Sequence, residues 1–519
     1  MILYESTRGD KKLYNFSQTI LKGIADDGGL FVPTRIPQFT VDQLKTLVHK
    51  SYQERAYFIF KLFETDFSDE TLKDIIYKAY STNFDVLQIA PVIKLKDNQY
   101  ILELWHGPTS AFKDLALQIM PHFFSEALKS DNQKRRKKGE KPLCYLILVA
   151  TSGDTGKAAL EGYKDKEGVS IIVFFPDKRV SKFQELSMTT QEGNNVEVYA
   201  MSGNFDDTQR CVKETFADND FNKLLLDKYQ TVLSSANSIN WGRLIPQIVY
   251  HVNSYLELAD QGTISLEETM DVAVPTGNFG NILAAFYAKK MGLPIRRLIC
   301  ASNANKVLTE VLQTGSYSVQ KRTLIKTPSP SMDIIIASNF ERLLYELTQD
   351  SKKVCEWMRE LKETKQFSVN EKTKQLFQKL FYADWVSNDD CLLTIKKIYE
   401  ETHYLMDTHT AVVQAVVERY QKDKQSETPI LICSTAHWTK FTADVYKALS
   451  GTPVNEINDL KLRGLDEFDI FNKLFQLVPD STRIPQNISN LKNKKIRHNV
   501  KCKPDRESVE KVIIKSINN

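Results

Sequence analysis

Leu143–Gly156 reads LCYLILVATSGDTG, an apolar run that ends in a turn of small and polar residues. The run has the length of a buried β-strand, and a segment of helix length follows the turn. Further short apolar runs lie at Val169–Phe175, Val196–Met201, Val272–Val274, Leu298–Ala301, Ile334–Ala337 and Ile430–Cys433. Because these runs alternate with amphipathic segments of helix length, the sequence predicts βα units, a parallel sheet and an α/β fold class.

The sequence on either side of this pattern has a different character. Residues 42–48 and 69–76 place apolar side chains at helical spacing behind an acidic start, and residues 26–33 form a tight turn into a short strand. The C-terminal residues are rich in Lys and Asn, which is typical of helices packed on the outside. We predict a mostly helical N-terminal domain over 1–90, an α/β region over 91–450 and a C-terminal helical extension over 451–519.

The composition indicates a soluble globular protein. The 519 residues are 42% hydrophobic and 26% charged, and the net charge is +4. This near-neutral charge gives no sign of the basic face that nucleic acid requires. The longest apolar runs have about eight residues, against the ~20 that cross a bilayer. We therefore expect no nucleic-acid partner and no membrane partner.

The cysteines point to a reducing compartment. There are 7 cysteines without a CxxC pair, and no Cys/His cluster has the spacing of a zinc site. The first ten residues are charged and lack the apolar core of a secretory signal. We expect a cytoplasmic protein with no metal site.

Small, polar or Gly-rich turns follow four of the apolar runs, at Thr151–Gly156, Pro275–Asn281, Ser302–Asn305 and Ser434–His437. In open parallel sheets such turns gather at the carboxyl ends of the strands, where ligands bind. Small residues let backbone N–H groups approach an anion, and the N-terminus of the next helix favours negative charge. Helix capping explains any single turn, but the two glycines within 277–281 favour a phosphate cradle.

The phosphate is not predicted to belong to ATP or NAD. Gly153–Lys157 has a shorter glycine spacing than a P-loop, and Ala158 stands where Ser or Thr would bind Mg²⁺. Gly277–Gly280 is not a GxGxxG motif. A phosphate-bearing cofactor that needs a reactive side chain remains.

Lys113 is the candidate for that side chain. It belongs to His106–Asp114 (HGPTSAFKD), between the strand-like Tyr100–Leu104 and the helix-like Leu115–Phe124. A cation at the first turn of a helix opposes the helix dipole, which lowers its pKa and favours the neutral amine. A neutral amine forms a Schiff base with an aldehyde such as pyridoxal phosphate (PLP).

Several short segments of this sequence, taken in order, resemble those of threonine synthase. They are Tyr4–Gly9 (YESTRG), Gly23–Pro33 (GIADDGGLFVP), His106–Asp114, Ala150–Gly156 (ATSGDTG), Pro275–Asn281 (PTGNFGN), Ser331–Leu344 (SMDIIIASNFERLL) and Ser434–His437 (STAH). The likeness spans essentially the whole chain and is to the longer fungal and bacterial form of the enzyme. It implies a fold-type II PLP enzyme similar to tryptophan synthase β, with two parallel-sheet lobes around a cofactor cleft.

The resemblance also implies roles for single residues. Lys113 would carry PLP as a Schiff base, and the Thr435 hydroxyl would bond the pyridine nitrogen. The residues implied to hold the cofactor phosphate are Gly277, Asn278, Phe279 and Asn281. The residues implied to meet the substrate are Ser152, Asp154 and Thr155, at its carboxylate and the cofactor ring face, and Asn240 and Arg243, near its phosphate.

The implied reaction converts O-phospho-L-homoserine and water into L-threonine and phosphate, the last step of threonine biosynthesis. One alternative is a phospho-lyase that releases 2-oxobutyrate and phosphate; another is a non-catalytic relative, against which Lys113, the phosphate turn and Thr435 argue. The oligomeric state stays open between monomer and dimer.

The sequence departs from the family pattern where Lys182 and Thr408 replace prolines, where Gly242 replaces an alanine, and at Trp438. We expect Trp438 to point outward. Three other features have ordinary structural interpretations. The basic run Lys134–Lys138 is predicted to be a solvated loop, and the aromatic-rich Tyr52–Phe63 a core helix. His251, His403 and His409 have no metal-like partners and are interpreted as structural histidines.

Overall fold

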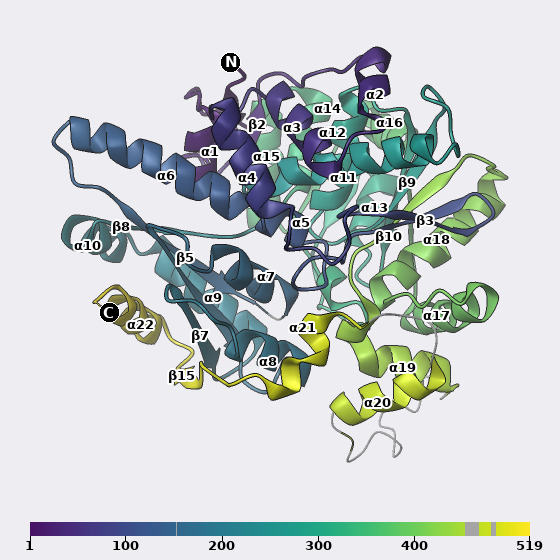
Figure 1. Cartoon of the computed structure of the whole chain (residues 1–519). Helices are drawn as coiled ribbons and strands as arrows, with labels where there is room; N and C mark the ends of the chain where they lie inside the picture. Colours follow the sequence, from purple (N-terminus) through teal and green to yellow (C-terminus); the bar gives the residue numbers. More distant parts are fainter. Residues whose placement is uncertain (152, 452–464, 466, 479–483, 519) are drawn as a thin grey trace.

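The computed structural model describes residues 1–151, 153–451, 465, 467–478 and 484–518, and its two main sheets form two lobes (Figure 1). The small lobe contains a five-stranded sheet in the order β15-β7-β6-β5-β8, in which all neighbouring strands are parallel. Its strands are β5 (Cys144–Ala150), β6 (Val169–Pro176), β7 (Val196–Met201), β8 (Thr231–Ser234) and β15 (Val500–Cys502).

The large lobe contains a six-stranded sheet in the order β13-β10-β9-β14-β4-β3. The β3–β4 pair is antiparallel, and the other neighbouring pairs are parallel. Its strands are β3 (Val92–Lys96), β4 (Gln99–Glu103), β9 (Met270–Pro275), β10 (Ile295–Ser302), β13 (Phe381–Trp385) and β14 (Ile430–Ser434). The predicted fold, with two mostly parallel sheets in an α/β chain, is confirmed.

The middle strands of the large sheet are buried on both faces. Leu431 and Cys433 on β14 join the hydrophobic cluster that includes helices α11 (Trp241–Asp260) and α12 (Gly280–Lys290). Ile432, between them, joins the cluster built with α17 (Asn388–Thr402) and α18 (Thr408–Lys424). Because alternate side chains leave a strand on opposite faces, helices on both sides require an unbroken apolar run.

The N-terminal region is mostly helical, as predicted. β1 (Tyr4–Ser6) pairs antiparallel with β2 (Phe31–Pro33), and four helices follow or intervene: α1 (Phe16–Lys22), α2 (Val41–Leu47), α3 (Tyr52–Leu62) and α4 (Asp69–Ala79). Ser51 begins α3 with a capping box to Glu54. Phe60 and Phe63 are fully buried. The interpretation of Tyr52–Phe63 as a core helix is therefore confirmed.

The remaining helices cover the sheets and connect the lobes. They are α5 (Asp114–Leu117), α6 (Met120–Lys137), α7 (Asp154–Tyr163), α8 (Lys182–Thr189), α9 (Phe205–Ala217), α10 (Asn219–Tyr229), α13 (Val307–Thr314), α14 (Phe340–Thr348), α15 (Ser351–Glu363), α16 (Glu371–Leu380), α19 (Thr442–Ser450), α20 (Glu467–Leu477), α21 (Gln486–Ser489) and α22 (Arg506–Asn518). A small antiparallel pair, β11 (Ser316–Ser318) and β12 (Gln366–Ser368), lies outside the two main sheets.

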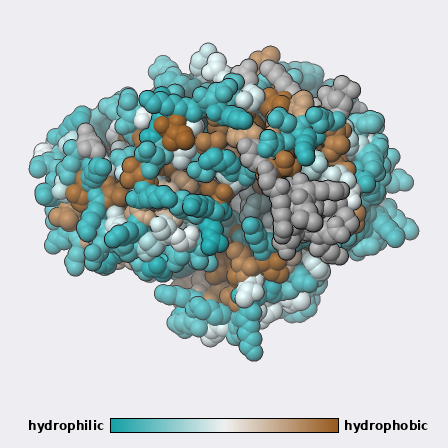
Figure 2. Space-filling view, turned by 90° about the horizontal axis from the view of Figure 1, so that it is seen from below, coloured by the Kyte–Doolittle hydropathy of each residue, from teal (hydrophilic) through white to brown (hydrophobic). Residues whose placement is uncertain are grey.

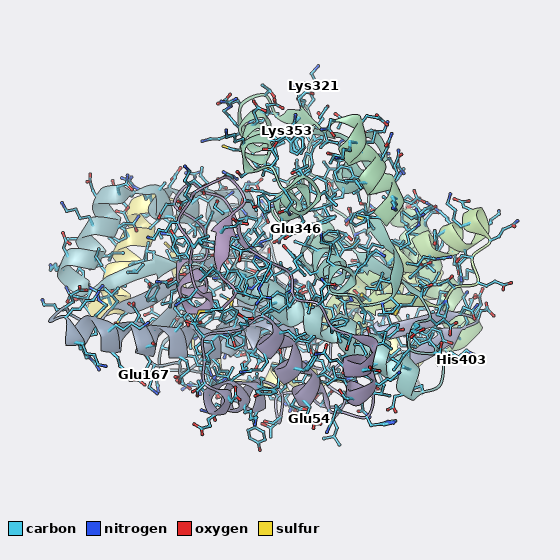
Figure 3. The ribbon with its side chains drawn as sticks, turned by 90° about the horizontal axis from the view of Figure 1, so that it is seen from above. Glu54, Glu167, Lys321, Glu346, Lys353 and His403 are labelled. Atoms are coloured by element: carbon cyan, nitrogen blue, oxygen red, sulfur yellow. The ribbon has the colours of Figure 1, made fainter. Side chains whose placement is uncertain are left out.

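The surface is mainly polar. Figure 2 shows a largely hydrophilic face on which apolar residues gather in small groups. Across the described ranges, no helix combines the length and the apolar character needed to cross a membrane. His403, which we interpreted as structural, is exposed at the end of α17 and lies at the edge of the molecule (Figure 3).

The predicted strand at Ile334–Ala337 is wrong, because this segment is a loop. The edge of the large sheet beside β10 is taken by β13, which the sequence did not predict. The loop instead packs Ala337 into the core and leaves Ile336 exposed, while the Ala337 N–H donates to the Tyr317 hydroxyl.

Around α6, one prediction is wrong and a second is right only in part. The basic run Lys134–Lys138 is not a loop, because α6 continues to Lys137 and the cations lie in its last turn, where the helix dipole favours them. The helix expected over Leu115–Phe124 is divided into α5 and α6. Pro121 lies in the first turn of α6, where its missing N–H costs nothing.

Trp438 does not point outward. Its side chain is 1% exposed and its ring stacks on Phe471 of α20, with the centroids 6.4 Å apart. The helix that supplies Phe471 belongs to the C-terminal extension, whose docking the sequence pattern does not specify. The indole is thus part of the core of the large lobe.

Candidate active site

Three of the four predicted turns meet at one cavity. The lining residues are Phe112, Lys113, Thr155, Asn237, Ser238, Arg243, Gln247, Val274, Pro275, Thr276, Gly277, Asn278, Phe279, Gly280, Asn281, Ile282, Ser331, Met332, His409 and Thr435. They come from the turns after β5, β9 and β14, from the loop before α5, from the segment before α11 and its first two turns, from the 3-10 turn Pro330–Met332, and from the start of α18. The fourth turn, Ser302–Asn305, has another role: the Asn303 amide bonds Thr327, Ser329 and Asp333.

A rigid loop presents Lys113 to the cavity. The buried Asp114 carboxylate accepts from the Thr109 N–H at 2.8 Å and from the Thr109 hydroxyl at 2.6 Å. Gly107 lies so close that a Cβ there would be 2.5 Å from Cβ of Asp114. The Phe112 N–H donates to the Thr435 carbonyl at 2.8 Å, so this loop is also fixed to the turn after β14.

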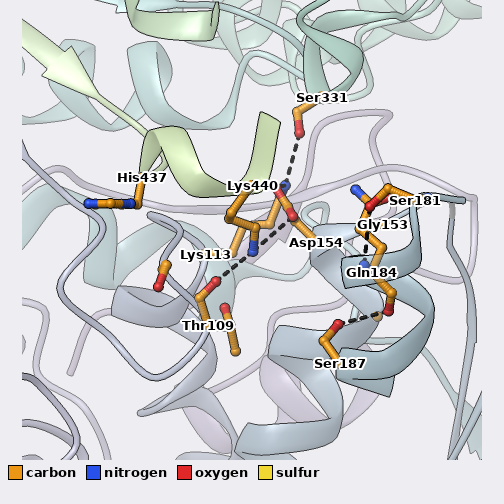
Figure 4. A network of polar contacts seen from close by, with 12 residues as sticks. Thr109, Lys113, Gly153, Asp154, Ser181, Gln184, Ser187, Ser331, His437 and Lys440 are labelled. Carbon is orange, nitrogen blue, oxygen red and sulfur yellow. Dashed lines mark hydrogen bonds and ion pairs between the residues drawn. The ribbon is translucent and has the colours of Figure 1, made fainter. Parts of the chain in front are cut away.

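Lys113 has a largely buried side chain, 11% exposed, whose amine lies between polar groups. Its Nζ lies 3.6 Å from Oδ2 of Asp154 and 3.4 Å from Oγ of Ser331 (Figure 4). Burial is the main cause that lowers the pKa of Lys113; Lys440 and Arg243 lower it further, and Asp154 acts in the opposite direction. The predicted direction is therefore confirmed, but α5 has only four residues and burial, not a helix dipole, is the main cause.

The Gly-rich turn after β9 leads into the N-terminus of α12. Phe279 caps this helix with φ 65° and packs its ring against Phe340 and Phe381. The first N–H groups of a helix have no partner within it and favour an anion. The Asn281 Oδ1 lies 2.9 Å from Nε2 of His251, while its buried Nδ2 has no hydrogen-bond partner in the part of the chain that the structure describes. This turn has the features of the predicted phosphate cradle.

Replacing Gly277 with alanine tests that cradle. A Cβ at this position would lie 2.6 Å from the backbone oxygen of Ser331. Overpacking of this kind costs about 1–3 kcal/mol, and ~1.4 kcal/mol already corresponds to a tenfold change in affinity. We expect Gly277→Ala to weaken PLP binding by about tenfold in a spectroscopic titration. Gly280→Ala is the matched control, because its Cβ would find its nearest neighbour at 3.6 Å; equal effects in both variants would contradict the steric argument.

Arg243 and Asn240, both predicted near a substrate phosphate, have different positions. Arg243 lines the cavity: its Nη1 donates to the Ala236 carbonyl at 2.7 Å, and its buried Nε has no partner. Burial lowers its pKa to about 10, so it stays charged at neutral pH. Asn240 caps α11 instead. Its side chain accepts from the Gly242 N–H and donates to the Ile20 carbonyl, and it is absent from the described lining of the cavity.

Asp154 lies between two ammonium groups at the start of α7. Its Oδ1 is 2.9 Å from Nζ of Lys440, and its Oδ2 faces Lys113. Burial opposes ionisation, but Lys440 and Lys113 outweigh it and hold the pKa of the carboxyl well below its usual range. The ionised Asp154 carboxylate repels the carboxylate of a substrate. The backbone N–H groups at the start of α7, and not the Asp154 side chain, are therefore suited to bind a substrate carboxylate. Thr155 lines the cavity, whereas Ser152 lies outside the described residues.

The sequence did not identify two side chains in this region. His409 was interpreted as structural, yet it lines the cavity: Nδ1 lies 2.7 Å from Asp407, and Nε2 accepts from the Ser331 N–H at 3.1 Å. The spacing of Asp407 and His409 at a helix start was the available signal. For Lys440, beside Asp154, the available signal was weaker: it is a lysine between the aromatic residues Trp438 and Phe441.

The residues of the cavity fit PLP. Lys113 supplies an amine with a lowered pKa, and the α12 N-terminus supplies donors for a phosphate. Among the described residues, the buried Asn281 Nδ2 and Arg243 Nε have no hydrogen-bond partner. A buried donor without a partner is costly, and anionic oxygens in the cavity would satisfy both.

Three family models match the chain. They are "Threonine synthase N terminus" over residues 3–80, "Pyridoxal-phosphate dependent enzyme" over 88–373 and "Threonine synthase, C-terminal" over 410–513. The threonine synthase of Schizosaccharomyces pombe is 39% identical over 86% of this chain and 90% of its own length. The human protein named threonine synthase-like 1 is 42% identical over 90% of this chain. The chain spans about 62% of the length of that human relative.

Solved structures agree over the full length. The crystal structure of threonine synthase from yeast has a TM-score of 0.87 and 34% sequence identity, and covers 99% of both chains. The PLP-bound threonine synthase from Brucella melitensis has a TM-score of 0.84 and 32% identity, and covers 100% of both. The chain therefore belongs to the threonine synthase family within the pyridoxal-phosphate dependent enzymes.

Proposed function

We propose that this chain is a threonine synthase, which converts O-phospho-L-homoserine and water into L-threonine and phosphate. The observation that carries the proposal is the position of Lys113, a buried amine in a cavity that also contains Arg243 and the α12 N-terminus. One cavity thus offers an amine for the aldehyde of PLP and donors for two phosphates, one of the cofactor and one of the substrate.

We assign the cofactor contacts to residues on both sides of the cavity. The turn containing Gly277, Asn278, Phe279 and Asn281 would hold the PLP phosphate, and the Thr435 hydroxyl would bond the pyridine nitrogen. Bound PLP supplies an electron sink that makes loss of the substrate Cα proton feasible. The amine of Lys113 accepts that proton and returns it elsewhere on the substrate, as a general base and then an acid.

Arg243 is the group that we assign to the substrate phosphate. Its Nε is buried, unpartnered and part of a planar fork that can bind two phosphate oxygens. The departing phosphate gains negative charge, and a fixed cation in a buried site stabilises that charge without reorganisation. The N–H groups at the start of α7, around Asp154 and Thr155, are the second set of donors.

The product distinguishes this proposal from its alternatives. Trp438, one of the departures from the family pattern, packs on Phe471 and is absent from the described lining of the cavity, so it gives the phospho-lyase no support. We expect the full chain, given PLP and O-phosphohomoserine, to release threonine and phosphate in equal amounts, measured by chromatography and a phosphate assay. Release of 2-oxobutyrate would replace the proposal with the phospho-lyase. An inert substrate and an unlabelled Lys113 after borohydride reduction would indicate a non-catalytic relative.

We also propose the division of the chain into residues 1–90, 91–450 and 451–519. The second part contains the described lining of the cavity and every strand of the two main sheets except β15. The third includes β15, which completes the sheet of the small lobe, besides helices α20 and α22.

A further inference from the structure

A second buried lysine, which the proposed mechanism does not use, lies beside Lys113. Lys440 belongs to the 3-10 turn Trp438–Phe441, directly after the turn that carries Thr435. Its Nζ lies 2.9 Å from Oδ1 of Asp154 and donates to the Thr109 carbonyl at 2.5 Å (Figure 4). Its side chain is 9% exposed. Since a buried ammonium is costly unless it is paired, these contacts hold it firmly in place.

The carboxylate of Asp154 joins the two lysines across the cleft. One oxygen faces Lys440, from the large lobe, and the other faces Lys113 at 3.6 Å. Asp154 itself begins α7, which packs on β6 in the small lobe. One buried carboxylate therefore connects three elements that are distant in the sequence.

We propose that Lys440 is a positioning residue, which holds Asp154 across the cleft and thereby sets the charge that Lys113 experiences. The inference rests on the proposed role of Lys113 as the amine that captures PLP. Asp154 contacts Lys113 directly, whereas Lys440 acts on Lys113 through Asp154 and through its own positive charge.

The sign of each effect follows from the charged groups around Lys113. These are Asp154, Lys440 and Arg243, and Asp154 is additionally influenced by His409. Removing the charge of Lys440 takes away a nearby cation, and Asp154 then pairs with Lys113 without competition from Lys440. The pKa of Lys113 therefore rises, and a smaller fraction of Lys113 is the neutral amine at neutral pH. Removing the charge of Asp154 leaves Lys113 facing only cations, so its pKa falls.

The experiment measures how fast the full chain captures PLP on Lys113 from pH 6 to pH 10. Borohydride traps the product, and peptide mapping quantifies the label on Lys113. At a pH below the pKa of Lys113, raising that pKa by about one lowers the amine fraction about tenfold. We expect Lys440→Met to slow capture at pH 7 by about tenfold and to move the pH midpoint of capture upward. Asp154→Asn should move this midpoint downward. Lys440→Arg, which keeps the positive charge, should leave the midpoint where it is in the unaltered chain.

Lys157→Met is the matched control. Lys157 is a partly buried lysine on the same helix as Asp154, but its Nζ pairs with Glu161, at 2.9 Å. The Lys157→Met variant should change the thermal stability of the protein without moving the pH midpoint of PLP capture. The inference would be overturned if the pH midpoint moved in the same direction in Lys440→Met and Asp154→Asn. It would also be overturned if the midpoint moved in neither variant while Lys113 was labelled normally. Absence of label on Lys113 in the unaltered chain would instead overturn the proposed function.

Discussion

Replacing Lys113 with alanine is expected to abolish threonine formation, with kcat reduced by at least about 10³-fold. Proton transfer by a positioned side chain contributes roughly 10²–10⁴-fold, and this lysine is also the proposed attachment point of the cofactor. Steady-state assays with O-phosphohomoserine measure the rate, and borohydride trapping reports the attachment. The rate of threonine formation and the amount of cofactor trapped by borohydride should both be lost in this variant.

A control separates this result from general damage to the fold. Lys157 is partly buried and also paired with a carboxylate, so Lys157→Met removes a comparable side chain. It should retain the label on Lys113 and most of the activity. A Lys113→Ala protein that kept the rate of the unaltered chain would remove this residue from the mechanism.

Gly162→Ala is expected to lower the free energy of unfolding more than any other added methyl group in the small lobe. Gly162 lies on α7, where a Cβ would approach the Leu117 carbonyl oxygen to 1.9 Å and Cγ of Pro121 to 3.1 Å. The carbonyl belongs to backbone and cannot rotate away, so α7 and α5 must separate. Overpacking of this kind costs about 3 kcal/mol or more of unfolding free energy, which chemical denaturation measures.

The same substitution should reduce activity beyond its effect on folding. Asp154 begins α7, and Lys113 directly precedes α5, so separating the two helices lengthens the contact between these side chains. A displacement of about 1 Å in an active site can reduce the rate by about 10²-fold. Gly242→Ala is the control: its Cβ would meet only side-chain atoms at 3.3 Å, and a helical alanine is favoured. Similar losses in both variants would contradict the steric explanation.

The sequence predicts the strands that helices cover on both faces. β5, β6, β9, β10 and β14 are such strands, and each appears as a continuous apolar run. Short strands such as β8 and β15 have no such run, since their pairing depends on a neighbour already in place. Periodicity also does not reveal that β14 lies between β9 and β4, because strand order depends on tertiary packing.

The candidate site could be predicted to a similar extent. Turns after strands are local features, and three of the four meet at the cavity. The partnerships of Lys440 and His409 are not local. Asp154 lies on the other lobe from Lys440, and Ser331 is on a separate loop from His409. Asn240 shows the converse, since a residue that the resemblance implies near the substrate phosphate caps a helix and bonds the N-terminal region.

The strand order of the two sheets has a consequence for how the chain is made. In the small lobe, β5, β6, β7 and β8 follow one another within residues 144–234, so this sheet can begin to form during synthesis. In the large lobe, β14 pairs with β4 and β9 but is synthesised long after both. Contacts of such high sequence separation slow folding. We therefore expect the strands of the small lobe other than β15 to pair early, and the insertion of β14 between β4 and β9 to be a late step in folding.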